Sequence, residues 1–336
     1  MTRPEQARAF IVAQGWADAA RSHVAGDASN RRYDRLTRSD GTSAILMDAP
    51  PDKGEDVRPF VQIALYLSQI GLSAPKIYAQ DAASGYLLIE DLGDDLFARL
   101  LASGADEQML YAAAVDVLCH LHAQTPPELD RYDAAAMTPL SLLAFDWYQQ
   151  AATGAVTRRS QAEAALRTVL EPLPCSVLIQ RDYHAENLLW MPARGGVARV
   201  GLLDFQDAIL GHPAYDLCSV LMDARRDVAP DVQQTMLARY CDRAAIEDTD
   251  AFEAAYWALA LQRNLRILGV FTRLCVRDGK ESYVDMIQRV WGHIEAAVQT
   301  PALAPQREAF IAALPVPSGD ILDRIRTQCA THPTQR

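Results

Sequence analysis

Several features that define large classes of protein are missing from this chain of 336 residues. Its six cysteines are widely scattered and form no CxxC pair, which argues against a disulfide framework or a zinc site and favours reduced thiols. No segment is long and apolar enough to cross a bilayer, and the opening MTRPEQARAF lacks the apolar run of a signal peptide. We therefore expect a cytoplasmic protein.

An excess of positive charge is missing as well. Lysine and arginine number 32 against 43 acidic residues, which gives a net charge of −11. General nucleic-acid binders and proteins that lie on acidic membranes need a basic face, so the charge argues against both kinds of partner. There is no internal repeat and no low-complexity tract. The length and the apolar content are sufficient for two domains or one two-lobed body.

The pattern of apolar residues predicts a small β-rich lobe followed by a larger helical lobe. Ser39-Asp40-Gly41 is a turn signal between two runs that can pair as a hairpin, and helical spacing follows over residues 60–70. Two more strand candidates complete the first lobe, and helical patterns then dominate apart from a short β insertion. We expect an α+β chain with lobes at residues 1–93 and 94–336.

The stretch VLIQRDYHAENLLW, residues 177–190, places a group of polar residues between two segments that are built to be buried. Asp182 and Asn187 lie five apart on a predicted loop, and Asp204 follows at the end of a strand in GLLDFQD. Phosphoryl transfer requires a carboxylate that accepts a hydroxyl proton, plus an amide and a second carboxylate that can hold Mg²⁺. Each residue alone is more often a turn former or a helix cap, but together they predict a phosphotransferase.

This segment resembles the catalytic loop of the aminoglycoside phosphotransferase family, relatives of the protein kinases, with the pattern H-[GR]-D-x-x-x-x-N followed by an Asp motif. The resemblance implies a bilobal protein-kinase-like fold, Asp182 as the general base, and Asn187 and Asp204 as ligands of Mg²⁺. Gln180 stands where the family has its first histidine, a residue that braces the loop, and glutamine can still form hydrogen bonds there. Asp216 resembles the family residue that holds the loop from below.

The resemblance spans nearly the whole chain and implies an ATP site in the first lobe. GDASNRRY stands where the nucleotide-clamping hairpin of the family begins, so the backbone N–H groups of Ala28, Ser29 and Asn30 are expected at the phosphates. YLLIEDLGDDLF resembles the interlobe hinge, in which the backbone of Glu90 and Leu92 pairs with adenine. Taken alone, each stretch would be an ordinary turn or edge strand.

The third-strand lysine of the kinases has no counterpart in AILMDAPP, where Met47 or Asp48 occupies its place. Either Lys53, just beyond, reaches back to the phosphates, or the backbone and the metal neutralise them alone. Glu55 would be the usual partner of such a lysine, although it is also a favourable first-turn acid for the helix that follows.

Four long segments resemble one branch of the family, the kinases that phosphorylate the anomeric hydroxyl of N-acetylmuramate and N-acetylglucosamine in peptidoglycan recycling, toward UDP-N-acetylmuramate. They are MDAPPDKGEDVRPF, LAFDWYQQ, DFQDAILGHPAYDLCSVLMDAR and LQRNLRILGVFTRLCVRDGK. A sugar site needs an aromatic platform with carboxylates and amides, and the lactyl carboxylate of N-acetylmuramate is best bound by an arginine. The expected acceptor residues are Asp146, Trp147, Tyr148, Arg181, Gln206, Asp207, Arg263 and Arg266.

Other interpretations stay open. Trp147 on a helix is more often a core residue, and two arginines three apart on a helix often form a solvated face. The acceptor could be an aminoglycoside, choline, homoserine or another small alcohol, and the arginines of QRNLR argue against a polycation. A nucleotide-binding pseudokinase scaffold is a further class, favoured by the missing lysine and by Gln180 but disfavoured by the complete catalytic set. The oligomeric state is left open.

Overall fold

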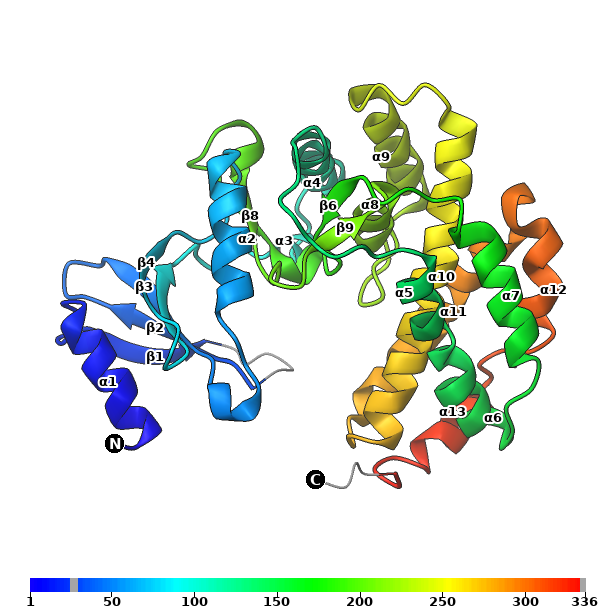
Figure 1. Cartoon of the computed structure of the whole chain (residues 1–336), viewed down its shortest axis with the longest axis horizontal. Coiled ribbons are helices and arrows are strands. Elements are labelled where there is room, and N and C mark those ends of the chain that lie inside the picture. Colours follow the sequence, from blue (N-terminus) through cyan, green and yellow to red (C-terminus); the bar gives the residue numbers. More distant parts are fainter. Residues whose placement is uncertain (25–29, 333–336) are drawn as a thin grey trace. The chain divides into compact units, whose positions relative to one another are not determined.

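The computed structural model describes residues 1–24 and 30–332. The chain divides into two compact units, Met1–Val117 with Ala185–Ala208, and Leu118–His184 with Ile209–Arg336. Strands gather in the first unit and helices dominate the second (Figure 1). The α+β organisation expected from the sequence is therefore confirmed, whereas the lobe boundary after residue 93 stays a prediction. None of the helices in the described ranges combines the length and apolarity that a bilayer span requires.

A five-stranded antiparallel sheet forms the centre of the first unit, with the strand order β1-β2-β3-β5-β4. Its strands are β1 (Ala20–Val24), β2 (Arg32–Thr37), β3 (Ser43–Asp48), β4 (Ile77–Asp81) and β5 (Tyr86–Glu90). The turn at residues 39–41 joins β2 to β3, as predicted, and it sets the register in which Tyr33 lies opposite Met47.

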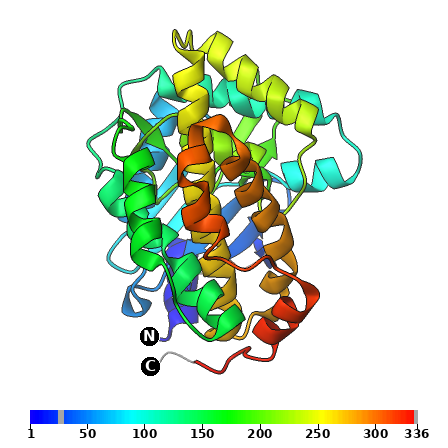
Figure 2. The same cartoon turned by 90° about the vertical axis from the view of Figure 1, so that its right-hand side faces the viewer.

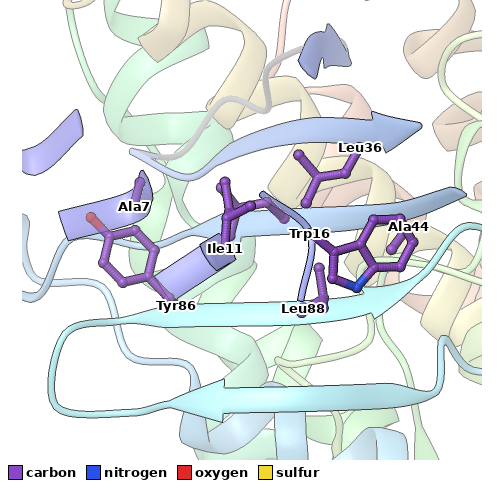
Figure 3. Packing of buried hydrophobic residues seen from close by; sticks show 8 residues of the cluster. Ala7, Ile11, Trp16, Leu36, Ala44, Tyr86 and Leu88 are labelled. Carbon is purple, nitrogen blue, oxygen red and sulfur yellow. The ribbon is translucent and has the colours of Figure 1, made fainter. Parts of the chain in front are cut away.

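Helix α1 (Arg3–Ala13) covers one face of this sheet (Figure 3). Ala7 and Ile11 lie four apart on the helix, so they point to the same side, where they meet buried residues of the strands. Burial of such side chains is the main favourable term in folding, at roughly 25 cal/mol per Å² of apolar surface. The strand residues and the aromatic residue that complete this cluster are Trp16, Leu36, Ala44, Leu46, Tyr86 and Leu88.

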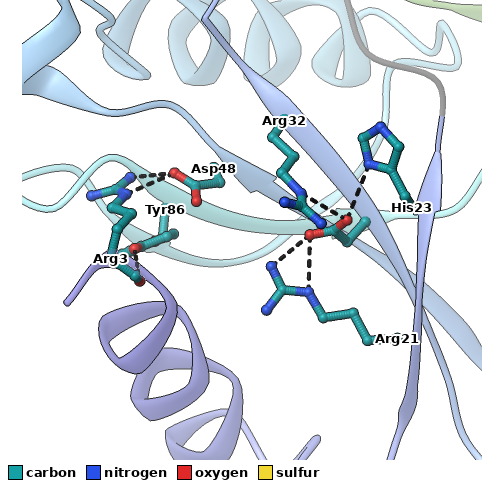
Figure 4. Close-up of polar contacts among 7 residues, drawn as sticks. Arg3, Arg21, His23, Arg32, Asp48 and Tyr86 are labelled. Carbon is teal, nitrogen blue, oxygen red and sulfur yellow. Dashed lines mark hydrogen bonds and ion pairs between the residues drawn. The ribbon is translucent and has the colours of Figure 1, made fainter.

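Ion pairs lie beside the core between α1 and the sheet (Figure 4). Nε of Arg3 donates to Asp48 at 2.8 Å, so Asp48 points toward α1. Because successive residues of a strand point to opposite faces, Met47 faces the other side of the sheet. Asp34 is 1% exposed and accepts hydrogen bonds from Arg21 at 2.9 Å and from Arg32 at 3.1 Å.

The first unit also contains α2 (Arg58–Gln69), α3 (Phe97–Ala102) and a β-hairpin contributed by the segment 185–208. The hairpin follows the 3₁₀ turn Ala185–Asn187 and pairs β7 (Leu188–Trp190) with β8 (Val200–Leu202). Phe60 of α2 packs against Phe205 just after β8, with ring centroids 4.8 Å apart. This contact fixes the position of the segment that carries Asp204.

The second unit is a helical body around α10 (Thr249–Val276), which packs against α5 (Ala134–Ser141), α7 (Arg159–Leu170), α8 (Ala214–Leu221) and α11 (Ile287–Gln299) (Figure 2). Its other elements include a two-stranded sheet of β6 (Val177–Ile179) and β9 (Ile209–Gly211). Helix α4 (Glu107–His122) crosses the division between the units. The described part of this unit also contains the π-helix η2 (Ala144–Gln149), α6 (Gln150–Thr153), α9 (Pro230–Arg243), the 3₁₀ helices η5 (Glu281–Met286) and η6 (Pro301–Gln306), α12 (Arg307–Ile311) and α13 (Gly319–Arg326).

Candidate active site

The loop that carries Asp182 follows the short buried strand β6 and is anchored by a carboxylate of α8. Arg181 has φ +71°, a conformation that residues other than glycine rarely adopt. Asp216 accepts the backbone N–H groups of Gln180 at 2.6 Å and of Arg181 at 2.9 Å. This anchor compensates for the unusual backbone and fixes the direction in which Asp182 leaves the loop. The supporting role expected for Asp216 is confirmed.

Asp216 is fully buried, and burial is the main influence on its protonation. Burial raises the pKa of the Asp216 carboxyl to about 7, although the N–H groups of Gln180 and Arg181 and the nearby Arg263 act in the opposite direction. The two hydrogen bonds by which the Asp216 carboxylate holds the loop therefore depend on pH near neutrality. His184, also buried in this region, lies 3.2 Å from Nη1 of Arg225, and burial together with Arg225 holds the pKa of its imidazole well below the usual value.

Two tyrosines and two arginines gather near Asp182 within the second unit. The rings of Tyr132 and Tyr215 meet edge to face, with centroids 5.4 Å apart. The guanidinium of Arg181 lies 5.2 Å from the centroid of the Tyr132 ring, and Nη1 of Arg266 donates to the Tyr215 hydroxyl at 3.4 Å. Burial lowers the pKa of Arg266, but Tyr215, Tyr132 and Asp182 together raise it above the usual value. Arg266 and Asp182 are therefore electrostatic neighbours.

Asn187 and Asp204 come together in the first unit. The backbone N–H of Leu203 donates to the carbonyl of Asn187 at 3.0 Å, and Nδ2 of Asn187 lies 3.4 Å from Oδ2 of Asp204. The other carboxylate oxygen of Asp204 accepts a hydrogen bond from Nε2 of Gln206 at 2.7 Å. Asp204 has φ +56°, so this carboxylate is held on a constrained turn. Gln206 thus orients Asp204, while Asp207 is exposed.

This pair suits a hard cation that keeps part of its water shell. Among the residues that the structure describes, no three His, Cys, Asp or Glu side chains gather as a cation site. One carboxylate and one amide oxygen are nevertheless a sufficient protein contribution for Mg²⁺, which usually takes its remaining ligands from water and substrate phosphates. The donor set of Asn187 and Asp204 therefore fits Mg²⁺.

The predicted hinge is held by side chains of the first unit. The N–H of Glu90 donates to the carbonyl of Lys76 at 2.8 Å, and the Glu90 carboxylate pairs with Arg194 at 2.6 Å. Leu92 packs closely on β8, because a Cβ placed on Gly201 would lie only 3.1 Å from Cδ1 of Leu92. The glycine therefore allows the hinge and β8 to approach each other.

A second ion pair fixes the rest of the hinge. Arg35 of β2 pairs with Asp91 at 2.7 Å and with Asp94 at 2.9 Å. Because Arg35 donates to two carboxylates at once, it restrains the chain that follows β5 at two points. The hinge is thus a braced segment.

Of the residues expected at the phosphates, the structure describes Asn30 and Lys53. Ala28 and Ser29 lie outside the described residues. The N–H of Asn30 donates to Glu55 at 3.0 Å, so this group is already occupied, and its side chain donates to the carbonyl of Lys53 at 3.3 Å. Lys53 itself is exposed and, within residues 1–24 and 30–332, has no carboxylate partner.

Arg31, which reasoning from the sequence missed, is the partner of Glu55. Its Nε lies 2.8 Å from the Glu55 carboxylate, and both side chains are 12% exposed. Arg31 lies directly before β2, and Tyr33 is among the groups that raise the pKa of its guanidinium, so the two side chains lie together. Because Tyr33 pairs with Met47, Arg31 lies on the same side of the sheet as Met47. The alternation within RRYDRLT is the only sequence signal that could have indicated this position.

The FDWY segment forms part of the π-helix η2, and its side chains diverge. Asp146 pairs with Arg159 at 2.8 Å on the surface, whereas Tyr148 is fully buried and donates its hydroxyl to the carbonyl of Pro315 at 2.7 Å. Trp147 is half-buried. Because their polar groups are already occupied, Asp146 and Tyr148 are left out of the acceptor site that we propose, and Trp147 stays a candidate.

Arg263 lies deep in the second unit on α10 and is 3% exposed. Its charge acts on the pKa values of Asp216 and His184, which places it beneath the catalytic loop. Among the described residues, its Nε and Nη1 atoms have no hydrogen-bond partner. This position favours support of the loop over direct contact with an acceptor.

A kinase-like sheet with a braced hinge, a loop aspartate anchored from below and a paired amide and carboxylate define a phosphotransferase. The chain belongs to the phosphotransferase enzyme family, which matches its residues 21–255. It is 39% identical to the N-acetylmuramate/N-acetylglucosamine kinase of Caulobacter vibrioides over 92% of this chain and 96% of that protein. It is 32% identical to the protein of the same name from Pseudomonas aeruginosa, over 91% and 93% of the two chains.

Solved structures support the fold. Choline kinase from Streptococcus pneumoniae aligns with a TM-score of 0.60 at 12% identity, over 90% of this chain and 99% of that one. An aminoglycoside-3'-phosphotransferase of type VIII aligns with a TM-score of 0.53 at 16% identity, over 77% of this chain and 98% of that one. The predicted bilobal protein-kinase-like fold is thereby confirmed.

Proposed function

We propose that this phosphotransferase transfers the γ-phosphoryl group of ATP to the anomeric hydroxyl of N-acetylmuramate and N-acetylglucosamine. The observation that carries the proposal is the 39% identity, over nearly the full length of both chains, to a kinase named for these two sugars. The product, a sugar 1-phosphate, suits peptidoglycan recycling toward UDP-N-acetylmuramate. Because the donor is ATP, the proposed location is the cytoplasm.

In this proposal Asp182 is the general base. Its carboxylate accepts the proton of the anomeric hydroxyl while the sugar oxygen forms a bond to the γ-phosphorus and the bond from that phosphorus to the departing ADP oxygen breaks. Such transfer depends mostly on positioning, and the hydrogen bonds of Asp216 to the loop provide it on the protein side.

Asn187 and Asp204 would hold Mg²⁺, and Gln206 would keep the Asp204 carboxylate in its ligating orientation. When bound, the ion neutralises negative charge on the phosphates. The backbone of Glu90 and Leu92 would pair with adenine at the braced hinge. Ala28 and Ser29 remain proposed contacts of the phosphates, whereas Asn30 and Lys53 are left out because the Asn30 N–H is bonded to Glu55 and Lys53 is exposed.

We further propose that Arg31 supplies the cation that is missing from β3. It lies on the same sheet face as Met47 and pairs with Glu55, the residue expected to partner a phosphate-binding lysine. A guanidinium presents several N–H donors that match phosphate oxygens.

An aminoglycoside acceptor is less compatible with the surroundings of Asp182. Such an acceptor carries several positive charges, and Arg181 and Arg266 both lie next to Asp182 within the second unit. Repulsion between like charges in a partly buried site would oppose binding. The same arginines suit an acceptor that is neutral or anionic.

Incubation with ATP, Mg²⁺ and each sugar, followed by ³¹P NMR, tests the proposal. We expect a phosphate ester at C1 of both sugars. The methyl glycoside of N-acetylglucosamine is a matched control, because its anomeric oxygen carries no proton, and it should give no product. Phosphorylation of the methyl glycoside would place the reaction at another hydroxyl. Nucleotide binding without turnover on any acceptor would favour a scaffold.

A further inference from the structure

Three arginines of the second unit lie around the catalytic loop without a carboxylate partner among the described residues, unlike most arginines that are at least partly buried. In most of those, the guanidinium is paired with a carboxylate: Arg3 with Asp48, Arg21 with Asp34, Arg31 with Glu55, Arg35 with Asp91 and Arg194 with Glu90. Arg181, Arg263 and Arg266 form no ion pair with any described residue. A buried charge without a partner is costly, and acidic residues are plentiful in a chain with a net charge of −11. Guanidinium groups left without a carboxylate around one loop therefore suggest a partner from outside the chain.

Arg263 and Arg266 lie one turn apart on α10, yet their surroundings differ. Arg263 is almost fully buried, and its neighbours are Asp216 and His184 beneath the loop. Arg266 has intermediate exposure, so part of its side chain lies at the surface of the unit. Of these two arginines, Arg266 is the one that combines partial exposure with a position beside the reacting group.

The position of Arg266 follows from direct contacts. Its Nη1 donates to the hydroxyl of Tyr215, the residue that precedes Asp216. Asp216 in turn accepts a hydrogen bond from the backbone N–H of Arg181, the residue directly before Asp182. The hydrogen bond to Tyr215 is long, at 3.4 Å against about 2.9 Å for a typical hydrogen bond. It therefore holds the guanidinium of Arg266 only weakly.

A carboxylate is the ligand that such a group recognises best. The planar guanidinium presents parallel N–H donors that match the two oxygens of a carboxylate, and partial burial strengthens the attraction. N-Acetylmuramate differs from N-acetylglucosamine by one lactyl group, which carries a carboxylate. When the anomeric hydroxyl lies at Asp182, the lactyl carboxylate of the same sugar also lies near Asp182. The cation that binds this carboxylate must therefore be close to Asp182.

We infer that Arg266 binds the carboxylate of the acceptor, and that Arg263 supports the catalytic loop without touching the sugar. The inference rests on the proposed function and makes it more specific, because it assigns the recognition of N-acetylmuramate to one side chain. The sequence offered Arg181, Arg263 and Arg266 as acceptor residues, and the inference assigns the carboxylate to Arg266.

The test compares three acceptors that differ in charge: N-acetylmuramate, its neutral methyl ester, and N-acetylglucosamine. We expect Arg266→Met, which keeps most of the apolar stem, to lower kcat/KM for N-acetylmuramate by about 10- to 100-fold. The values for the ester and for N-acetylglucosamine should fall much less and by similar factors, because loss of the charge beside Asp182 affects all acceptors alike. Arg266→Lys should restore part of the loss, because it returns the charge without the planar fork.

Two further arginines of α10 serve as comparisons. Arg273 lies on the same helix, and the charges that act on its pKa include Arg266 but not Asp182, so Arg273→Met should change the three values little and to the same extent. Arg263→Met should lower kcat for the three acceptors alike, because it acts through the loop.

Equal losses for all three acceptors in Arg266→Met would overturn the inference, since Arg266 would then serve Asp182 alone. A loss confined to N-acetylmuramate in Arg263→Met would overturn it as well, by reversing the two roles. Failure of the proposed function has a different signature, because the unaltered enzyme would then phosphorylate none of the three acceptors.

Discussion

The Asp216 carboxylate accepts the backbone N–H of Arg181 at 2.9 Å and so holds a residue whose φ is +71°. Its second oxygen accepts the neighbouring N–H of Gln180 at 2.6 Å. One buried side chain of α8 thus fixes two consecutive peptide groups directly before Asp182. This relationship links the helical packing of the second unit to the placement of the base.

Replacement of Asp216 by Asn should impair catalysis and alter its pH dependence. The Asn side chain offers one acceptor oxygen, and its NH₂ group would face the second backbone N–H, so we expect kcat to fall about tenfold or more. In the wild type, kcat should decrease as the pH falls through about 7, because the protonated carboxyl of Asp216 holds the loop less well. Asp216→Asn should lack this decrease, and a retained decrease would assign it to another group.

The raised pKa of Asp216 also predicts how stability changes with pH. In the unfolded chain this carboxyl titrates at its ordinary value of about 4, whereas in the fold its pKa is about 7. Between these values the folded state binds the additional proton, so this contribution to the free energy of unfolding is lost as the pH rises toward 7. Urea unfolding of the wild type and of Asp216→Asn at pH 5 and pH 8 measures it. An equal pH dependence in both would contradict the assignment.

Arg31 and Lys53 should differ in their effect on the nucleotide. We expect Arg31→Met to raise KM for ATP about tenfold, because it removes the only cation paired with Glu55 in the described structure. Lys53→Met, at an exposed position, is the matched control and should change KM for ATP little. Steady-state kinetics with ATP varied at saturating sugar give both values. The reverse order would return the phosphate contact to Lys53.

Gly269 should be essential for the packing of α10 against the segment before η2. A Cβ at this position would overlap the backbone carbonyl of Leu143, so Gly269→Ala should destabilise the fold by about 1–3 kcal/mol. A Cβ on Gly292, in α11, would meet none of the described atoms within 4 Å, so Gly292→Ala should instead stabilise the fold, by up to about 1 kcal/mol. Chemical denaturation of both variants checks the opposite signs.

The catalytic loop could be predicted from sequence because its residues are close together in the chain. Asp182 and Asn187 lie five apart, and apolar strands flank them, so local pattern was sufficient. The hairpin of β2 and β3 followed from its turn in the same way. Local pattern also indicated the hinge segment, although its ion pairs with Arg35 and Arg194 depend on distant parts of the chain.

Contacts between residues that are distant in the chain determine the features that local sequence pattern could not predict. The hydroxyl of Tyr148 is bonded to Pro315, 167 positions away, and this contact places the ring in the core. The pairing of Arg31 with Glu55 depends on which face of the sheet each residue occupies. The difference between Arg263 and Arg266 reflects the packing around α10, which their spacing in the sequence does not reveal.

Asp182 is the residue on which the proposed chemistry depends. The most direct measurement is ³¹P NMR of N-acetylmuramate with ATP and Mg²⁺, in the presence of the wild type or of Asp182→Asn. We expect the wild type to form the C1 phosphate ester and Asp182→Asn to be slower by about 100-fold or more, with its affinity for ATP retained. Formation of the ester by Asp182→Asn at a near-wild-type rate would contradict the role of Asp182 as the base.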